Sequence, residues 1–148
     1  MNFGLFIGRF QPVHLGHVHV IKQALEHCDK LIIGIGSANT HVSQKNPFTA
    51  DQRIDMLKLA VGEHWDRIVP IKIDDMIYND VEWINHIHTQ IDQAVHLVSD
   101  DSITLFGHSK DSSSYYLKIF PEFKHVEISN FHNISATSIR NAWFNPVS

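Results

Sequence analysis

Short apolar runs alternate along the chain with longer stretches that are apolar on one face only. The runs predict five strands, at residues 3–7, 30–36, 67–73, 102–107 and 124–128. The intervening stretches predict helices at residues 15–28, 50–62, 80–98, 112–120 and 136–143. Residues 31–35 are apolar almost without interruption, which is typical of a strand covered on both faces of its sheet.

This alternation of strands and helices predicts an α/β fold. We expect a Rossmann-like, parallel five-stranded sheet with helices on both faces, since parallel neighbours need a crossover between them. A chain of 148 residues is long enough for one such domain. Open parallel sheets bind ligands beyond the carboxyl ends of their strands, so the loop after the first strand is the first place to look for a site.

That loop leads into a helix start that carries two histidines. His14 and His17 are three residues apart, so they share a face of the first helical turn. Gly16 between them leaves the backbone open to a bulky anion, and Arg9 lies just upstream. The unpaired N–H groups and the positive dipole end of a helix start favour phosphate. The pattern therefore predicts a polyphosphate site.

A second helix start rich in donors lies near the carboxyl end. Ser135 is suited to cap a helix, and Thr137 and Ser138 offer hydroxyl groups in its first turn. Arg140 follows one turn later. Two helix starts of this kind, facing one cleft, could hold the triphosphate of ATP between them.

These segments resemble the signatures of a known family. Residues 8–17 read Gly-Arg-Phe-Gln-Pro-Val-His-Leu-Gly-His, which is similar to the HxGH signature of the nucleotidylyltransferase superfamily. In its longer form the segment resembles the archaeal-type nicotinamide mononucleotide adenylyltransferases. Residues 134–140 resemble the superfamily's second, ISSTxxR-type signature. Class I aminoacyl-tRNA synthetases share the short HxGH motif, but no KMSKS-like run is present.

The resemblance implies transfer of the adenylyl group of ATP to the 5′-phosphate of nicotinamide mononucleotide (NMN), giving NAD and pyrophosphate. It implies catalytic roles for His14, His17, Arg140 and Arg9. The residues implied in binding ATP are Gly8, Arg9, Phe10, Gln11, His14, Gly16, His17, Gly107, Ser135, Thr137, Ser138 and Arg140. Mg²⁺ would be held through the ATP phosphates and water, because no cluster of carboxylates marks a protein-held metal site.

Three further segments bear on the acceptor substrate. Residues 35–38 and 46–53 resemble the family's GSA…NPFTAxER stretch, with Gln52 in place of the usual acidic residue. Residues 79–83 resemble the NxxxW segment, in which a tryptophan stacks on the nicotinamide ring. The residues implied in binding NMN are Ser37, Asn46, Arg53, Asn79 and Trp83.

Residues 106–117 resemble a bacterial branch in which the adenylyltransferase is fused to a carboxyl-terminal Nudix hydrolase domain. No Nudix box, with its cluster of glutamates, occurs in the sequence. We therefore expect residues 1–148 to form one nucleotidylyltransferase domain, either as a stand-alone relative or as a part of such a fusion.

Composition narrows the range of partners. The net charge of −4 comes without a basic stripe, which argues against nucleic acid as a partner. No apolar run reaches the roughly 18 residues that a membrane span needs. The single cysteine, Cys28, is typical of a reducing compartment, so we expect a cytoplasmic protein. Twelve histidines suggest metal binding, but no CxxC or HExxH motif accompanies them. The family often forms oligomers, so a homo-oligomer is also expected.

Three alternatives stay open from the sequence. The first is another transferase of the superfamily, acting on pantetheine phosphate, on a flavin mononucleotide, or on a phospho-alcohol with CTP. The second is a sensor that binds NAD or ATP without turnover. The third is a tRNA-charging fragment, which the acidic charge and the missing KMSKS run disfavour.

Overall fold

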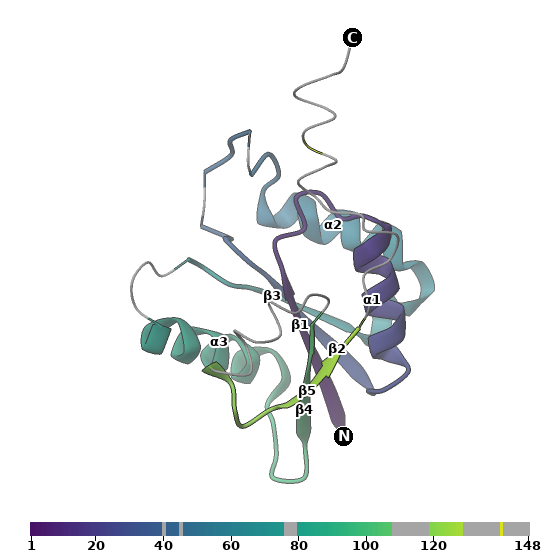
Figure 1. Cartoon of the computed structure of the whole chain (residues 1–148), viewed down its shortest axis with the longest axis vertical. Helices are drawn as coiled ribbons and strands as arrows, with labels where there is room; N and C mark the ends of the chain where they lie inside the picture. The colour runs from purple at the N-terminus through teal and green to yellow at the C-terminus, as the bar shows by residue number, and fades with distance from the viewer. Residues whose placement is uncertain (40, 45, 76–79, 108–118, 129–139, 141–148) are drawn as a thin grey trace.

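The five predicted strands form one parallel sheet in the computed structural model (Figure 1), which describes residues 1–39, 41–44, 46–75, 80–107, 119–128 and 140. The strands are β1 (Asn2–Gly8), β2 (Lys30–Ile35), β3 (Ile68–Lys72), β4 (Ser102–Gly107) and β5 (Lys124–Glu127). The helices are α1 (Leu15–Leu25), α2 (Ala50–Val61) and α3 (Asp80–Val95), with a 3₁₀-helix, η1 (Gly62–Arg67), after α2. The predicted α/β fold class is confirmed.

Helices cover both faces of the sheet, which explains why its inner strands are apolar almost throughout. Successive residues of β1 point to opposite faces. Phe6 packs in the core formed with α1 and α2, whereas Leu5 and Ile7 pack in a second core with α3. Figure 1 shows α1 and α2 on one side of the sheet and α3 on the other.

The order of the strands is β3-β2-β1-β4-β5, so the first strand of the chain lies at the centre. From β1 the chain moves outward to β2 and β3 on one side, and later to β4 and β5 on the other. The strand order therefore reverses between β1 and β4. A crevice at the carboxyl ends of these strands is the usual ligand site of such sheets, and the loop with the paired histidines leaves β1 there.

Tertiary contacts decide where the first helix ends. The prediction extended it to residue 28, but α1 ends at Leu25. Arg67, at the end of η1, donates from Nη2 to the carbonyl oxygens of Leu25 and Cys28, both at 2.7 Å. Its Nε donates to the carbonyl of Asp29 at 3.0 Å. This distant guanidinium satisfies carbonyls at and just beyond the end of the helix, which have no partner within a helix.

The other helices also end where the backbone leaves the helical region. Gly62 caps α2 with φ of 65°, and His96 follows α3 with φ of 44°. The hydrophobic pattern gave no sign of η1, which follows α2 directly. The predicted helices at 112–120 and 136–143 lie outside the described residues except for positions 119, 120 and 140. Within the described part of the chain, no helix is both long and apolar enough to span a membrane.

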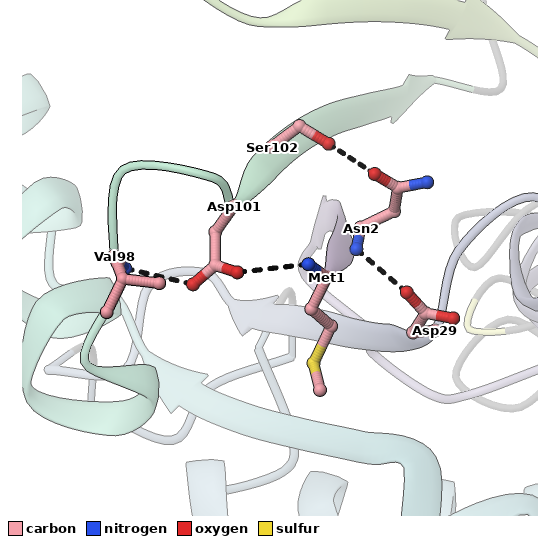
Figure 2. A network of polar contacts seen from close by, with 6 residues as sticks. All are labelled: Met1, Asn2, Asp29, Val98, Asp101 and Ser102. Carbon is pink, nitrogen blue, oxygen red and sulfur yellow. Dashed lines mark hydrogen bonds and ion pairs between the residues drawn. The ribbon is translucent and has the colours of Figure 1, made fainter.

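Polar contacts hold the amino end of the central strand β1, which is the end opposite to the histidine loop (Figure 2). The Met1 ammonium donates to Asp101 Oδ1 at 3.1 Å, and the backbone N–H of Val98 donates to Asp101 Oδ2 at 2.9 Å. The backbone N–H of Asn2 donates to Asp29 Oδ2 at 2.8 Å. The hydrogen bond from the Val98 N–H and, secondarily, the hydrogen bond from the Met1 ammonium lower the pKa of Asp101. These contacts tie the start of β1 to the loops that precede β2 and β4.

Gly4 tests how closely one face of β1 is packed. A methyl group at this position would lie 2.7 Å from Phe106 Cε2, 2.8 Å from Leu31 Cδ1 and 2.9 Å from Cys28 Sγ. All three neighbours are buried, so none can move without displacing others. We expect Gly4→Ala to lower the free energy of unfolding by about 1–3 kcal/mol, the usual cost of overpacking.

Urea unfolding followed by circular dichroism measures this effect. Leu59→Ala is the control, because Leu59 is 85% exposed and such a change usually alters stability by less than about 0.5 kcal/mol. Equal unfolding midpoints for Gly4→Ala and wild type would contradict the packing described here.

Candidate active site

The start of α1 is capped by the two histidines themselves. His14 is the N-cap residue, with extended backbone, and its Nδ1 accepts the backbone N–H of Gly16 at 3.0 Å. In return, Nδ1 of His17 accepts the backbone N–H of His14 at 3.1 Å. These reciprocal bonds form a capping box in which imidazoles replace the usual hydroxyl and carboxyl groups. The two rings stack, with centroids 3.7 Å apart and planes inclined by 21°.

The capping box determines which nitrogen of each ring carries a proton. A backbone N–H can only donate, so each Nδ1 that accepts one must be unprotonated. The neutral imidazole then has its proton on Nε2. Both histidines are therefore held in the tautomer that offers an Nε2–H donor. A pair of such donors beside a helix start suits a chain of phosphates.

Aromatic packing fixes the position of the histidine pair. His17 is only 6% exposed, and its ring centroid lies 4.6 Å from that of Phe10. Phe10 in turn makes an edge-to-face contact with Phe6 in the core. Phe10 adopts φ of 53°, which is uncommon for a bulky residue and typical of functional loops. Because its side chain is buried, the predicted contact of Phe10 with ATP would have to come from its backbone.

Gln11 joins the histidine loop to two other segments. Its side-chain amide donates to the carbonyl of Phe48 and accepts the N–H of Phe48, both at 3.0 Å. Its backbone carbonyl accepts Nη1 of Arg140 at 2.7 Å. The structure thus brings Arg140, more than 120 positions away in the sequence, to the loop that carries the histidines.

Arg9 lies close enough to Arg53 and to Arg140 to affect both of them electrostatically. Burial and, secondarily, the charge of Arg9 lower the pKa values of both Arg53 and Arg140. The Arg9 side chain is held by Asn46, whose Oδ1 accepts its Nη2 at 2.7 Å. Neighbouring like charges of this kind create a positive potential that an anion would relieve.

Arg53 is the most buried of the three, with 1% of its surface exposed. Its Nη1 donates to the carbonyl oxygens of Arg9 and Gly36, both at 2.7 Å. Its Nε donates to the carbonyl of Thr49 at 3.1 Å. Arg53 therefore joins the loops that follow β1 and β2 from within. Its predicted contact with the mononucleotide stays a prediction, and the structure adds this bracing role.

A pocket of about 290 Å³ opens beside these loops. It is lined by Ile7, Gly8, Arg9, Gly36, Ser37, Ile73, Asp75 and Trp83. Four of these residues, Gly8, Arg9, Ser37 and Trp83, were named from the sequence. Its volume is close to the lower end of the roughly 300–1,000 Å³ typical of small-molecule sites.

Sequence reasoning missed Asp75, which lines this pocket and accepts a hydrogen bond from Ser37 Oγ at 3.0 Å. Its position was the available signal. Asp75 lies shortly after β3, which ends at Lys72, and polar residues just beyond the carboxyl ends of parallel strands are placed to meet a ligand.

The remaining predicted site residues divide into two groups. Gly16 is buried in the first turn of α1, and Gly107 is buried at the end of β4, where its carbonyl accepts the N–H of Ile128 at 2.7 Å. The positions predicted to contact ATP or the mononucleotide at Asn79, Ser135, Thr137 and Ser138 lie outside the described residues.

The histidines of α3 have structural partners. His86 Nε2 accepts the backbone N–H of Asp74 at 3.1 Å, and His88 Nε2 lies 3.0 Å from Glu122 Oε1. In the described ranges of the chain, no group of three or more His, Cys, Asp or Glu side chains is arranged to hold a metal ion.

Two histidines cap the helix that follows the first strand, in a parallel sheet of order β3-β2-β1-β4-β5. This is the arrangement expected of a nucleotidylyltransferase site. The chain belongs to the cytidylyltransferase-like family, whose model matches residues 5–142. It is 39% identical over 145 residues to the nicotinamide/nicotinic acid mononucleotide adenylyltransferase of Acinetobacter baylyi, an alignment that covers 97% of this chain and 76% of that protein.

Two other relatives are longer than the part that aligns. The nicotinamide-nucleotide adenylyltransferase of Saccharolobus solfataricus is 42% identical over 92 residues, covering 60% of this chain and 53% of that protein. The crystal structure of a bifunctional NMN adenylyltransferase/ADP ribose pyrophosphatase from Francisella tularensis superposes with a TM-score of 0.90 at 36% identity. That match covers 99% of this chain but only 43% of the Francisella chain.

Replacing Arg53 tests its bracing role. Arg53→Met keeps the bulk of the side chain but leaves the carbonyls of Arg9 and Gly36 without their donor in a buried place. We expect the free energy of unfolding to fall by about 2–3 kcal/mol. Lys58→Met removes a positive charge from an exposed position on the same helix and should change stability by less than about 0.5 kcal/mol. If both variants unfold at the same urea concentration, Arg53 is not the brace.

Proposed function

We propose that this chain transfers the adenylyl group of ATP to the 5′-phosphate of nicotinamide mononucleotide, giving NAD and pyrophosphate. The observation that carries the proposal is the histidine pair at the start of α1, locked in the tautomer that donates from Nε2. Arg9 and Arg140 lie at the same loop, and the names of the relatives agree with this reaction.

In this proposal the triphosphate of ATP lies across the amino end of α1. His14 and His17 donate from Nε2 to oxygens of the α- and β-phosphates. Arg140 and Arg9 neutralise the β- and γ-phosphates and the departing pyrophosphate. The predicted donors of Ser135, Thr137 and Ser138 would add to them from the second helix start. Charge-assisted hydrogen bonds of this kind are the strongest that a protein offers to phosphate.

The reaction needs no nucleophile from the protein. A phosphate oxygen of the mononucleotide attacks the α-phosphorus of ATP, and the bond from that phosphorus to the oxygen bridging to the β-phosphate breaks. Pyrophosphate leaves with the bonding electrons. Holding both reactants in line can supply roughly 7–11 kcal/mol of the rate acceleration. Donors aimed at the charge that develops on the transferred group supply much of the rest.

The mononucleotide would occupy the pocket beside Trp83. Its pyridinium ring is flat and cationic, and an indole face attracts such a ring by about 1–2 kcal/mol when water is excluded. Ser37 and Asn46, with the predicted contacts of Arg53 and Asn79, would bind the rest of the molecule.

A divalent metal ion generally accompanies ATP in nucleotidyltransferases, and we propose Mg²⁺ here. The described side chains at the site are mainly arginine and histidine donors, which suit phosphate oxygens rather than a hard cation. Mg²⁺ would therefore be held by the phosphates and water, where it supplies further neutralisation of charge. The protein's own residues align the phosphates.

We also propose that residues 1–148 act as one nucleotidylyltransferase domain in the cytoplasm, with small nucleotides rather than nucleic acid as partners. A homo-oligomer and an adjoining Nudix domain stay predictions. The Francisella relative combines two activities in one chain, and this chain covers only 43% of it. We therefore propose adenylyl transfer alone, and not the pyrophosphatase activity, for this chain.

Formation of NAD tests the proposed function directly. Wild-type protein, ATP, Mg²⁺ and the mononucleotide are incubated, and NAD is measured by coupled reduction with alcohol dehydrogenase. His17→Ala should lower kcat at least about 100-fold, the scale on which a lost transition-state donor acts, with a much smaller rise in KM for the mononucleotide. Normal turnover in this variant would remove His17 from the mechanism.

His17→Gln separates catalysis from helix capping. Glutamine at this position of a capping box can still accept the N–H of His14, so the folded structure should be retained. We expect its unfolding midpoint to stay near that of the wild type while turnover remains low. Restored turnover in His17→Gln would show that the cap, and not the imidazole, is what the reaction requires.

Trp83 provides a separate test of the acceptor site. Trp83→Ala should weaken binding of the mononucleotide about 10-fold, as expected from loss of a desolvated cation–π contact, and leave ATP affinity nearly unchanged. Calorimetric titration with each nucleotide measures the two effects. Equal losses for both nucleotides would mean that Trp83 acts only in packing against Phe120.

A further inference from the structure

Asp75 is the one carboxylate among the described residues that line the pocket. The other polar lining side chains are those of Arg9 and Ser37. The proposed function does not use Asp75, because adenylyl transfer requires no base from the protein.

Contacts from the loop after β2 hold Asp75 in place. Ser37 Oγ donates to its Oδ1 at 3.0 Å. The Asn39 side chain accepts the backbone N–H of Asp75 at 2.9 Å and lies 3.4 Å from its carbonyl oxygen. Ser37 adopts φ of 52°, so the backbone there is also shaped for this arrangement. The carboxylate is therefore positioned rather than freely mobile.

One face of α3 holds the same strand end. Trp83, His86 and Gln90 lie three and four residues apart, so they share a helix face. Gln90 donates to the carbonyl of Lys72 at 2.9 Å, and His86 accepts the N–H of Asp74 at 3.1 Å. The indole and the Asp75 carboxylate are thereby placed together at one pocket.

The pocket also carries opposite charges. Arg9 is one of its lining residues, and Asp75 is the carboxylate that partly opposes the burial and the Arg9 charge that lower the pKa of Arg53. A pyridine mononucleotide has the same polarity, with an anionic phosphate and a cationic ring. Placing the phosphate toward the histidine loop, where it meets the α-phosphate of ATP, puts the ring beside Trp83 and Asp75.

We propose that Asp75 is a specificity-determining residue that favours the carboxamide form of the pyridine mononucleotide over the carboxylic acid form. This inference rests on the proposed function. The amide NH₂ of the nicotinamide form can donate to a carboxylate, whereas the nicotinic acid form would bring a second carboxylate to the same place. A site built to accept a hydrogen bond discriminates against a ligand that cannot donate it.

Asp75→Asn is the decisive variant. Asparagine has nearly the same shape, its Oδ1 can still accept from Ser37, and it removes the charge. Asp74→Asn is the matched control, because it removes the same charge one residue away from a side chain that does not line the pocket. For each protein, kcat/KM is measured with nicotinamide mononucleotide and with nicotinic acid mononucleotide, at saturating ATP and Mg²⁺.

We expect the wild type and Asp74→Asn to prefer the amide form equally. In Asp75→Asn the preference should fall about 10-fold, the scale of one hydrogen bond to a charged group, mainly because the acid form becomes a better substrate. A wild type that prefers the acid form, or an unchanged ratio in Asp75→Asn while NAD is still formed, would overturn the inference and leave the proposed function standing.

Calorimetric titration with the two mononucleotides keeps the test independent of turnover. If the wild type forms no NAD but binds the amide form more tightly, and Asp75→Asn loses that preference, the proposed reaction is wrong and the specificity inference is supported. If Asp75→Asn loses affinity for both forms equally, Asp75 shapes the pocket without selecting between them, and the inference is overturned.

Discussion

A buried guanidinium holds together the two loops on which the site is built. Arg53 donates to the carbonyl of Arg9 after β1 and to that of Gly36 after β2, and both bonds are short. A charge that is 1% exposed is tolerated only when protein acceptors replace the water it loses. The backbone carbonyls meet that need, and in return the loops are held side by side. The histidine loop and the pocket are thus both supported by Arg53.

The histidine pair uses the same bonds for structure and for chemistry. Each Nδ1 satisfies a backbone N–H that the start of α1 would otherwise leave unpaired. Those bonds also select the tautomer with a donor at Nε2. Stacking of the rings and the contact of His17 with Phe10 hold the pair against the core. The helix start is therefore stabilised by the residues proposed to bind phosphate, with no separate capping residue.

Much of the architecture was predictable because it depends on local patterns. The alternation of apolar strands and amphipathic helices is confirmed in all five strands and in the three helices that the structure describes. Thr49 and Gln52 form a capping box at the start of α2, with both bonds present, and their spacing of three residues is the sequence signature of this motif. It also gives Gln52 a role, since its side chain accepts the N–H of Thr49. The end of α1 was not predictable, because Arg67, distant in the sequence, donates to the carbonyls there.

The sequence by itself determined the family, the α/β fold class and the histidine pair, because each is recorded in patterns of residues that are close together along the chain. Tertiary structure decided which distant groups meet there. It brought Arg140 to the carbonyl of Gln11, turned Arg53 inward, and set Asp75 beside Ser37 at the pocket. Such pairings depend on how strands are ordered and how loops are held. The spacing of residue types along a chain shows the periodicity of a helix or a strand. It does not show which loops meet at the same ends of the strands.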